Sequence, residues 1–293
     1  MEFDFGSYVN QKKNGTAGER GEGYAYEGDL KVLRAMRSMR SVELAVSQTV
    51  KLSKNFLKSE MLGTAVKVGP VQFSRVHAIV QDCARTLGIS EPTVYIVPQI
   101  ASINAATYGT EDEAFIMVHA ATIDHLTDEE LRFVIGHECG HIQNNHVVYL
   151  TTLHVLRMFV QNLAGVLFAP LLLPVTLALS AWSRAAEVSC DRAGLLCCKD
   201  LGVATRAFVK LAVGGKVLFR EINVDAYLDQ FREGREGVGR VRELAASHPY
   251  LPRRIEALRI FADSALYHAA TGQEGGIDRA ELEKRTAEVI QVL

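Results

Sequence analysis

The chain has 293 residues, of which 48% are hydrophobic and 23% are charged, and its formal net charge at pH 7 is −2. This length and apolar content suffice for one large hydrophobic core. A nearly balanced charge without a basic cluster argues against nucleic acid as a partner.

Residues 1–28 are rich in glycine and polar side chains. We predict a flexible segment over 1–28 and a folded domain over 29–293. The first residues lack the apolar stretch and the cleavage site of a secretion signal. The five cysteines form no disulfide framework: Cys83, Cys139, Cys190, Cys197 and Cys198. Together these features favour a cytoplasmic protein, with membrane association left open by the apolar segment described below.

The first predicted elements precede the central part of the chain. Apolar residues at helical spacing between Asp29 and Leu62 predict an amphipathic helix or a helix pair. A further helix is expected over Val71–Leu87, ended by Gly88. Short β-branched and apolar runs separated by turn residues then predict three strands: Thr93–Val97, Ile103–Tyr108 and Phe115–His119.

The central helix begins with a capping box, in which Thr127 is the N-cap and Glu130 is the third helical residue. It continues into His-Glu-Cys-Gly-His at 137–141, which matches the zinc-hydrolase pattern HExxH. Histidines four apart lie about 40° apart around a helix, so both rings can reach one ion. Glu138 then lies beside that ion, where its carboxylate can take a proton from a water activated by the metal.

A catalytic zinc requires a third protein ligand. A metzincin would have glycine and histidine where this chain has Asn144 and Val147. His146 lies about 140° from the ligand face of an ideal helix, which favours a polar surface or a supporting role behind the ligands.

A better candidate for the third ligand is Glu187, which shares a helical face with Asp191. Glu187 can bind zinc while Asp191 accepts the ring N–H of a ligand histidine. The alternative is a solvated charged face, since Arg184 and Arg192 lie nearby.

The connection between these segments is unusually apolar, because residues 158–183 contain no Asp, Glu, Lys or Arg. Two membrane crossings need about 40 apolar residues. Residues 147–182 provide 36, interrupted by Arg157, Pro170 and Pro174. We therefore predict a helical hairpin over 147–182 that turns near 169–174. It can pack against the N-terminal helix as core, enter a membrane, or pair with a second copy of the chain.

The sequence beyond Asp191 predicts further helices, with loops at 232–239 and 271–276. The expected fold is therefore α+β and mainly helical, with one small sheet, in which the helix of the HExxH motif and the helix of Glu187 are joined by the apolar hairpin.

Three segments resemble the M48 family of metallopeptidases, which includes Ste24-like and HtpX-like enzymes, within the zincin-like gluzincin class. They are the motif at 137–141, the stretch at 183–191, and Ser247-His248-Pro249 followed by Arg254-Ile255. The resemblance implies one zinc ion per chain, held by His137, His141 and Glu187, with Glu138 as general base and acid and Asp191 behind the ligands.

The resemblance also implies two substrate-binding features. His248 would lie near the substrate carbonyl, although it could instead be a capping or buried structural histidine. The strand with Asn104 and Ala105 would border the cleft, where an extended peptide can add as another strand. Asn104 could equally be a residue of a turn or a strand end.

These observations predict a zinc endopeptidase that acts on a peptide or protein substrate. The alternative is a catalytically silent scaffold of this family that binds a partner protein or a membrane through the hairpin. The identity of the substrate is left open by the sequence.

Overall fold

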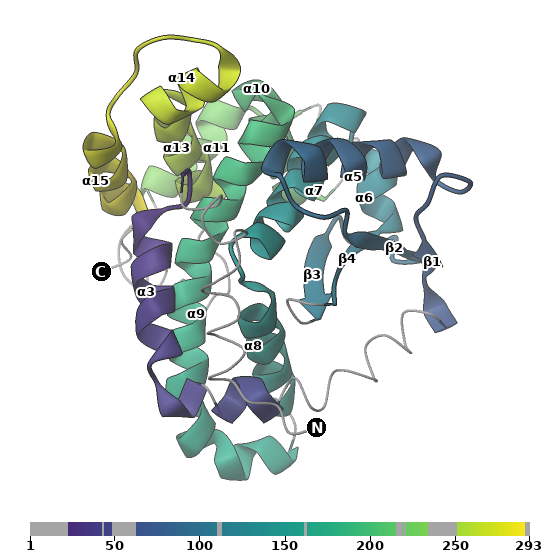
Figure 1. Ribbon diagram of the computed structural model, residues 1–293, viewed down its shortest axis with the longest axis vertical. Helices are drawn as coiled ribbons and strands as arrows, with labels where there is room; N and C mark the ends of the chain where they lie inside the picture. The colour runs from purple at the N-terminus through teal and green to yellow at the C-terminus, as the bar shows by residue number, and fades with distance from the viewer. Residues whose placement is uncertain are drawn as a thin grey trace.

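The computed structural model describes residues 23–42, 44–48, 63–109, 113–160, 163–214, 219, 221–233 and 251–290. Helices make up most of this part of the chain, and a small sheet lies on one side of the long helix α9 (Figure 1). The prediction of a mainly helical α+β fold is confirmed.

The sheet has four strands in the order β1-β2-β4-β3. They are β1 (Val66–Lys67), β2 (Thr93–Val97), β3 (Ala105–Gly109) and β4 (Ala114–His119). β2 pairs with β4 in parallel, whereas β1 with β2 and β3 with β4 are antiparallel. The three predicted strands are present within two residues of their expected bounds, and β3 occupies an edge of the sheet. β1 is too short to give a sequence signal.

Helices α5 (Ser74–Leu87) and α6 (Ala120–His125) lie before the HExxH motif on either side of β2–β4, and α7 (Asp128–Gln143) carries the motif. Helix α5 ends at Gly88 in the left-handed conformation, as predicted, and α6 follows β4. Helix α7 begins with the predicted capping box, in which Thr127 and Glu130 each bond the other's backbone N–H. The cap fixes the start of α7, and with it the direction in which the motif presents its side chains.

The predicted hairpin is present, but the predicted position of its turn is wrong. Helix α8 (Val147–Val160) ends well before residue 169, and α9 (Leu163–Cys198) runs through both Pro170 and Pro174. A proline removes one helical hydrogen bond and bends a helix without having to end it. In Figure 1 the first turns of α9 lie at an angle to the remainder of the helix.

The hairpin packs against the N-terminal helices, as one of its three interpretations predicted. The N-terminal helices are α3 (Glu27–Arg37) and the helical residues 40–42 and 44–48, which matches the expected helix pair. Residues 49–62 lie outside the described part of the chain. Their buried side chains meet α8 and α9 in one hydrophobic cluster: Leu33, Met36, Val42, Val46, Val148, Tyr149, Leu153, Leu156, Val175, Leu179, Trp182 and Ala186.

The predicted boundary between the N-terminal segment and the folded domain lies too late in the chain. Tyr24, Ala25 and Tyr26 are buried, so the residues directly before α3 belong to the fold, and 1–22 lie outside the described part of the chain. Burial of two aromatic side chains explains the difference, since it offsets the entropy lost on ordering the backbone.

Contact of the hairpin with a membrane or a second copy stays a prediction. Met158, Leu173 and Leu177 are exposed on it. Among the residues that the structure describes, no helix combines the length and the apolar character that a membrane crossing requires.

The C-terminal helices cover the end of α9 at which Glu187 and Asp191 lie (Figure 1). They are α10 (Leu201–Val213), α11 (Val224–Glu233), α13 (Leu251–Ala262), α14 (Ala265–Thr271) and α15 (Arg279–Ile290). The predicted loop at 271–276 is confirmed, because α14 ends at Gly272 and α15 starts at Arg279. Most of the predicted loop at 232–239 lies outside the described residues.

Packing of the hairpin against α3 can be tested with two leucines on α9. The Leu179 side chain is fully buried, whereas Leu177 is 49% exposed. We expect Leu179→Ala to lower the free energy of unfolding by about 2–5 kcal/mol through lost burial and a residual cavity. Leu177→Ala should change it by less than about 1 kcal/mol. Urea denaturation of the full chain measures both values, and equal effects would contradict the packing.

Candidate metal centre

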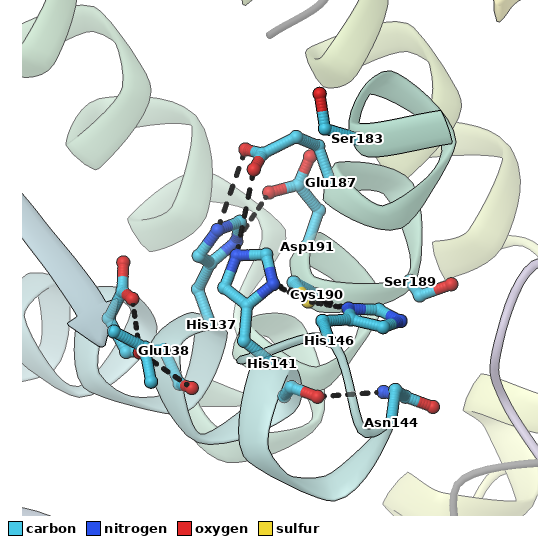
Figure 2. A network of polar contacts seen from close by, with 12 residues as sticks. His137, Glu138, His141, Asn144, His146, Ser183, Glu187, Ser189, Cys190 and Asp191 are labelled. Atoms are coloured by element: carbon cyan, nitrogen blue, oxygen red, sulfur yellow. Dashed lines mark hydrogen bonds and ion pairs between the residues drawn. The ribbon is translucent and has the colours of Figure 1, made fainter. Parts of the chain in front are cut away.

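His137, His141 and Glu187 converge on one point between α7 and α9 (Figure 2). Nε2 of His137 lies 3.5 Å from Oε2 of Glu187, and Nε2 of His141 lies 3.5 Å from Oε1. All three side chains are buried, and their candidate ligand atoms lie within 4.8 Å of one another. The structure therefore brings together the three ligands predicted from the sequence.

The spacing of these atoms suits a small divalent metal ion. With bonds of about 2.0–2.2 Å in a tetrahedral shell, ligand atoms are about 3.3–3.6 Å apart, which includes the observed 3.5 Å. Two imidazoles and one carboxylate are also a donor set that zinc uses in catalytic sites. These three side chains could therefore hold a metal ion of this class.

The two histidines have different electrostatic surroundings. Burial lowers the pKa of His141, and Glu187 opposes that effect only in part. Burial acts in the same direction on His137, but the hydrogen bond to Asp191 and the carboxylate of Glu187 outweigh it and raise its pKa. Two buried carboxylates thus favour a positive charge at this place, which a divalent metal ion would supply.

Asp191 lies behind the ligands, as the sequence predicted. Its Oδ1 is 2.9 Å from Nδ1 of His137, which leaves Nε2 of that ring facing Glu187. Arg254 on α13 donates to both oxygens of Asp191, at 2.8 and 2.6 Å, and its Nη1 lies 2.9 Å from Oε2 of Glu187. The guanidinium therefore joins the carboxylate of Glu187 to the carboxylate of Asp191, which contacts the ring of His137.

Glu138 is buried beside the convergence point, with its carboxylate turned to β3. The hydroxyl of Thr107 donates to Oε2 of Glu138 at 2.6 Å. Figure 2 shows the Glu138 side chain apart from the group formed by His137, His141 and Glu187. This placement matches a residue that works next to a metal without binding it.

A cleft opens in front of these residues. Its lining includes His137, Glu138, His141 and Glu187, and residues 104–108 of β3 and the segment before it form one wall. Helix α8 also contributes to the lining: Leu150, Leu153, His154 and Arg157. Asn104 and Ala105 thus border the cleft as predicted, whereas His248 lies outside the described residues.

The surface interpretation of His146 is wrong. The residue is fully buried, and its Nδ1 lies 3.2 Å from Nδ1 of His141. The reason is that α7 ends at Gln143 and Asn145 has a φ of 59°, so the chain turns His146 back toward the ligands. The structure thus agrees with the other interpretation, a supporting role behind a ligand.

The five cysteines are free and buried, in agreement with the prediction of no disulfide framework. Cys190 contacts one of the two motif histidines, since its Sγ lies 3.2 Å from Nδ1 of His141. Burial raises its pKa well above that of an ordinary thiol.

Thr107 and Arg254 are two polar groups of the site whose roles the sequence did not reveal. Arg254 belongs to a segment that carries the family resemblance, which was a usable signal. Thr107 occupies a strand without any local motif, and only the packing of β3 on α7 places it against Glu138.

Comparison with known proteins agrees with this geometry. The family model described as peptidase family M48 matches residues 70–262. Plastoglobule-localized metallopeptidase 48 of Arabidopsis thaliana is 35% identical over 189 residues, which are 62% of this chain and 52% of the relative. This chain thus spans about half the length of that relative.

Two further relatives are named as homologs of the protease HtpX. The protein of Thermoanaerobacter pseudethanolicus is 25% identical over 228 residues, which cover 67% of this chain and 74% of the relative. The protein of Methanothermobacter thermautotrophicus is 36% identical over 85 residues, which cover 29% of this chain and 33% of the relative. No solved structure matches the chain.

The family match includes the HExxH helix, Glu187, Asp191 and Arg254. The resemblance seen in the sequence is confirmed, and the chain belongs to peptidase family M48, a family of metallopeptidases.

Proposed function

We propose that this protein is a zinc-dependent endopeptidase that hydrolyses peptide or protein substrates. The observation that carries the proposal is the convergence of His137, His141 and Glu187 beside Glu138, at the wall of a cleft bordered by an edge strand. Membership of a metallopeptidase family supports the same reaction class.

His137, His141 and Glu187 would hold the zinc ion, because Nε2 of each histidine lies 3.5 Å from a carboxylate oxygen of Glu187, a separation that a tetrahedral shell allows. When bound, zinc would lower the pKa of a water molecule toward about 7 and polarise the carbonyl of the scissile bond. Asp191 fixes the tautomer of His137, so that its Nε2 lone pair faces the ion.

Glu138 carries the proton in this proposal. Its carboxylate takes a proton from the attacking water and later gives it to the leaving amine. Thr107 donates a hydrogen bond to one oxygen of Glu138, which orients the side chain and leaves the second oxygen for the proton. Burial of both residues keeps this arrangement fixed.

The edge of β3 would bind the substrate backbone. Gly109 exchanges both of its backbone hydrogen bonds with the hydroxyl of Thr151 on α8, so its N–H and C=O face away from β4. Alternate residues of an antiparallel strand face the same edge, which places the backbone groups of Ala105 and Thr107 on this side too. An extended peptide can add there as a strand, held largely without reading its sequence.

The zinc site gives the first prediction. The full chain should retain one zinc ion after dialysis, lose it to a strong chelator, and show bonds of about 2.0–2.2 Å to His137, His141 and Glu187 in an experimental structure. Elemental analysis measures the stoichiometry. A refined structure in which His137 and Glu187 are too far apart to share an ion would refute the ligand assignment.

A substitution of Glu138 distinguishes an active enzyme from a catalytically silent scaffold. Glu138→Gln should keep its zinc and its fold but lose about 10²–10⁴-fold in cleavage of unfolded casein, because the proton carrier is gone. Glu129→Gln is the matched control, since Glu129 lies on the same helix and its side chain is 57% exposed. A zinc-loaded parent that never cleaves casein or any other peptide would favour the scaffold.

Asp191→Asn should lower the affinity for zinc by about 10–100-fold without abolishing binding. It should also lower the melting temperature of the metal-free protein, because Arg254 loses one of its two charged partners in a buried place. Competition with a chelating dye measures the affinity, and Asp225→Asn, whose side chain is 85% exposed, serves as the control. Unchanged zinc affinity would show that Asp191 serves only Arg254.

A further inference from the structure

Behind His141, on the side away from Glu187, a chain of buried polar groups leads to the N-terminal helix. Nδ1 of His141 lies 3.2 Å from Nδ1 of His146, and Nε2 of His146 lies 3.0 Å from Oδ2 of Asp29 on α3. The second contact has the distance of an ion pair, but Nε2 of His146 does not meet the geometry of a hydrogen bond. His146 and Asp29 both have no exposed surface.

The protons in this chain can be assigned once His141 binds a metal through Nε2. A neutral His141 then carries its proton on Nδ1 and needs an acceptor there. Nδ1 of His146 can accept it only if the proton of that ring is on Nε2, where it faces the carboxylate of Asp29. In the reverse tautomer, the Nδ1–H of His146 would face the Nδ1–H of His141. The Nε2 lone pair of His146 would face the carboxylate of Asp29.

Asp29 is itself held in place by α9. Its Oδ1 accepts from Nε1 of Trp182 at 2.9 Å, and its Oδ2 accepts from the hydroxyl of Ser189 at 2.6 Å. Burial would raise the pKa of Asp29, but the proximity of His146 and these hydrogen bonds outweigh it and lower the pKa. The buried carboxylate is therefore the fixed end of the chain.

A second metal ion is the rival interpretation, because His141, His146 and Cys190 also form a group that could hold one. Cysteine binds metals as a thiolate. Burial and the neighbouring carboxylates of Glu187, Asp29 and Asp191 raise the pKa of Cys190 and oppose that form. His141 would also have to give up its last proton to bridge two ions. Hydrogen bonding accounts for the distances among His141, His146 and Cys190 without deprotonating either Cys190 or His141.

We propose that His146 and Asp29 are positioning residues that orient His141 for zinc binding, so that the N-terminal helix completes a site whose ligands lie on α7 and α9. The inference rests on the proposed zinc site. Asp29 precedes residues 70–262, which the family model matches, so the contribution comes from outside that region.

The experiment compares two replacements of His146 in the full chain, leucine and asparagine, which are similar in size and shape to each other. The measured quantity is zinc affinity. His146→Leu removes the acceptor for Nδ1–H of His141, and zinc affinity should fall by about 10–100-fold. His146→Asn can place an amide oxygen near that proton and should retain at least part of the lost affinity. Melting temperatures of the metal-free variants are measured beside the affinities, so that damage to the fold is recognised separately.

Asp29→Asn tests the far end of the chain. An asparagine has one acceptor oxygen for three donors, from His146, Trp182 and Ser189, so at least one contact is lost in either orientation. We expect a fall in zinc affinity in the same direction as for His146→Leu, and a changed absorption spectrum of the cobalt-substituted protein. Asp225→Asn is the control for loss of a carboxylate elsewhere.

Several results would overturn the proposal. One is an unchanged zinc affinity in both His146→Leu and Asp29→Asn, and another is equal losses for leucine and asparagine at position 146. Two zinc ions in the parent, one of which is lost in Cys190→Ala, would establish the second metal site instead. A parent that binds no zinc at all would refute the proposed function rather than the role of His146.

Discussion

The candidate metal centre depends on how closely α7 approaches α9. A Cβ atom added to Gly140 would lie 2.8 Å from Cβ of Ala193 and 3.1 Å from Cα of Cys190, and one added to Gly136 would lie 2.7 Å from Cβ of Cys197. Contacts under 3.0 Å are not tolerated in a packed interior. Two glycines one turn apart on α7 therefore set the distance between the helices, and that distance lets two side chains of α7 meet a carboxylate of α9.

The same crossing concentrates charge in the interior. Glu187 and Asp191 are both buried, and buried carboxylates are costly unless they are paired and hydrogen-bonded. Arg254 provides one compensating charge by contacting both groups, and its guanidinium also lies over the ring of Phe208. The remaining negative charge faces the two histidines. A cation at that point would offset this charge, which gives the candidate metal site an electrostatic reason as well as a geometric one.

The parts of this fold that could be predicted are those with local signals. The capping box located α7, the apolar spacing located α3 and α5, and β-branched runs located three strands. The turn of the hairpin could not be placed, because Pro170 and Pro174 are as compatible with a bent helix as with its end. The surface interpretation of His146 failed for a related reason: the angular spacing of an ideal helix no longer applies once Asn145 takes a left-handed conformation. The contacts of Glu138 with Thr107 and of Asp191 with Arg254 join distant parts of the chain and have no local signature.

The distances along the sequence have a consequence for folding. Groups at the centre come from α3, β3, α7, α9 and α13, so an unfolded chain contains no preformed site. Metal affinity then includes the free energy of bringing these elements together, and a bound ion stabilises the folded chain by mass action. In such an arrangement the N-terminal helix is not a peripheral addition. Trp182 and Ser189 on α9 hold Asp29 next to His146, and His146 in turn contacts His141. Displacement of α3 would therefore change the contacts that orient the ring of His141.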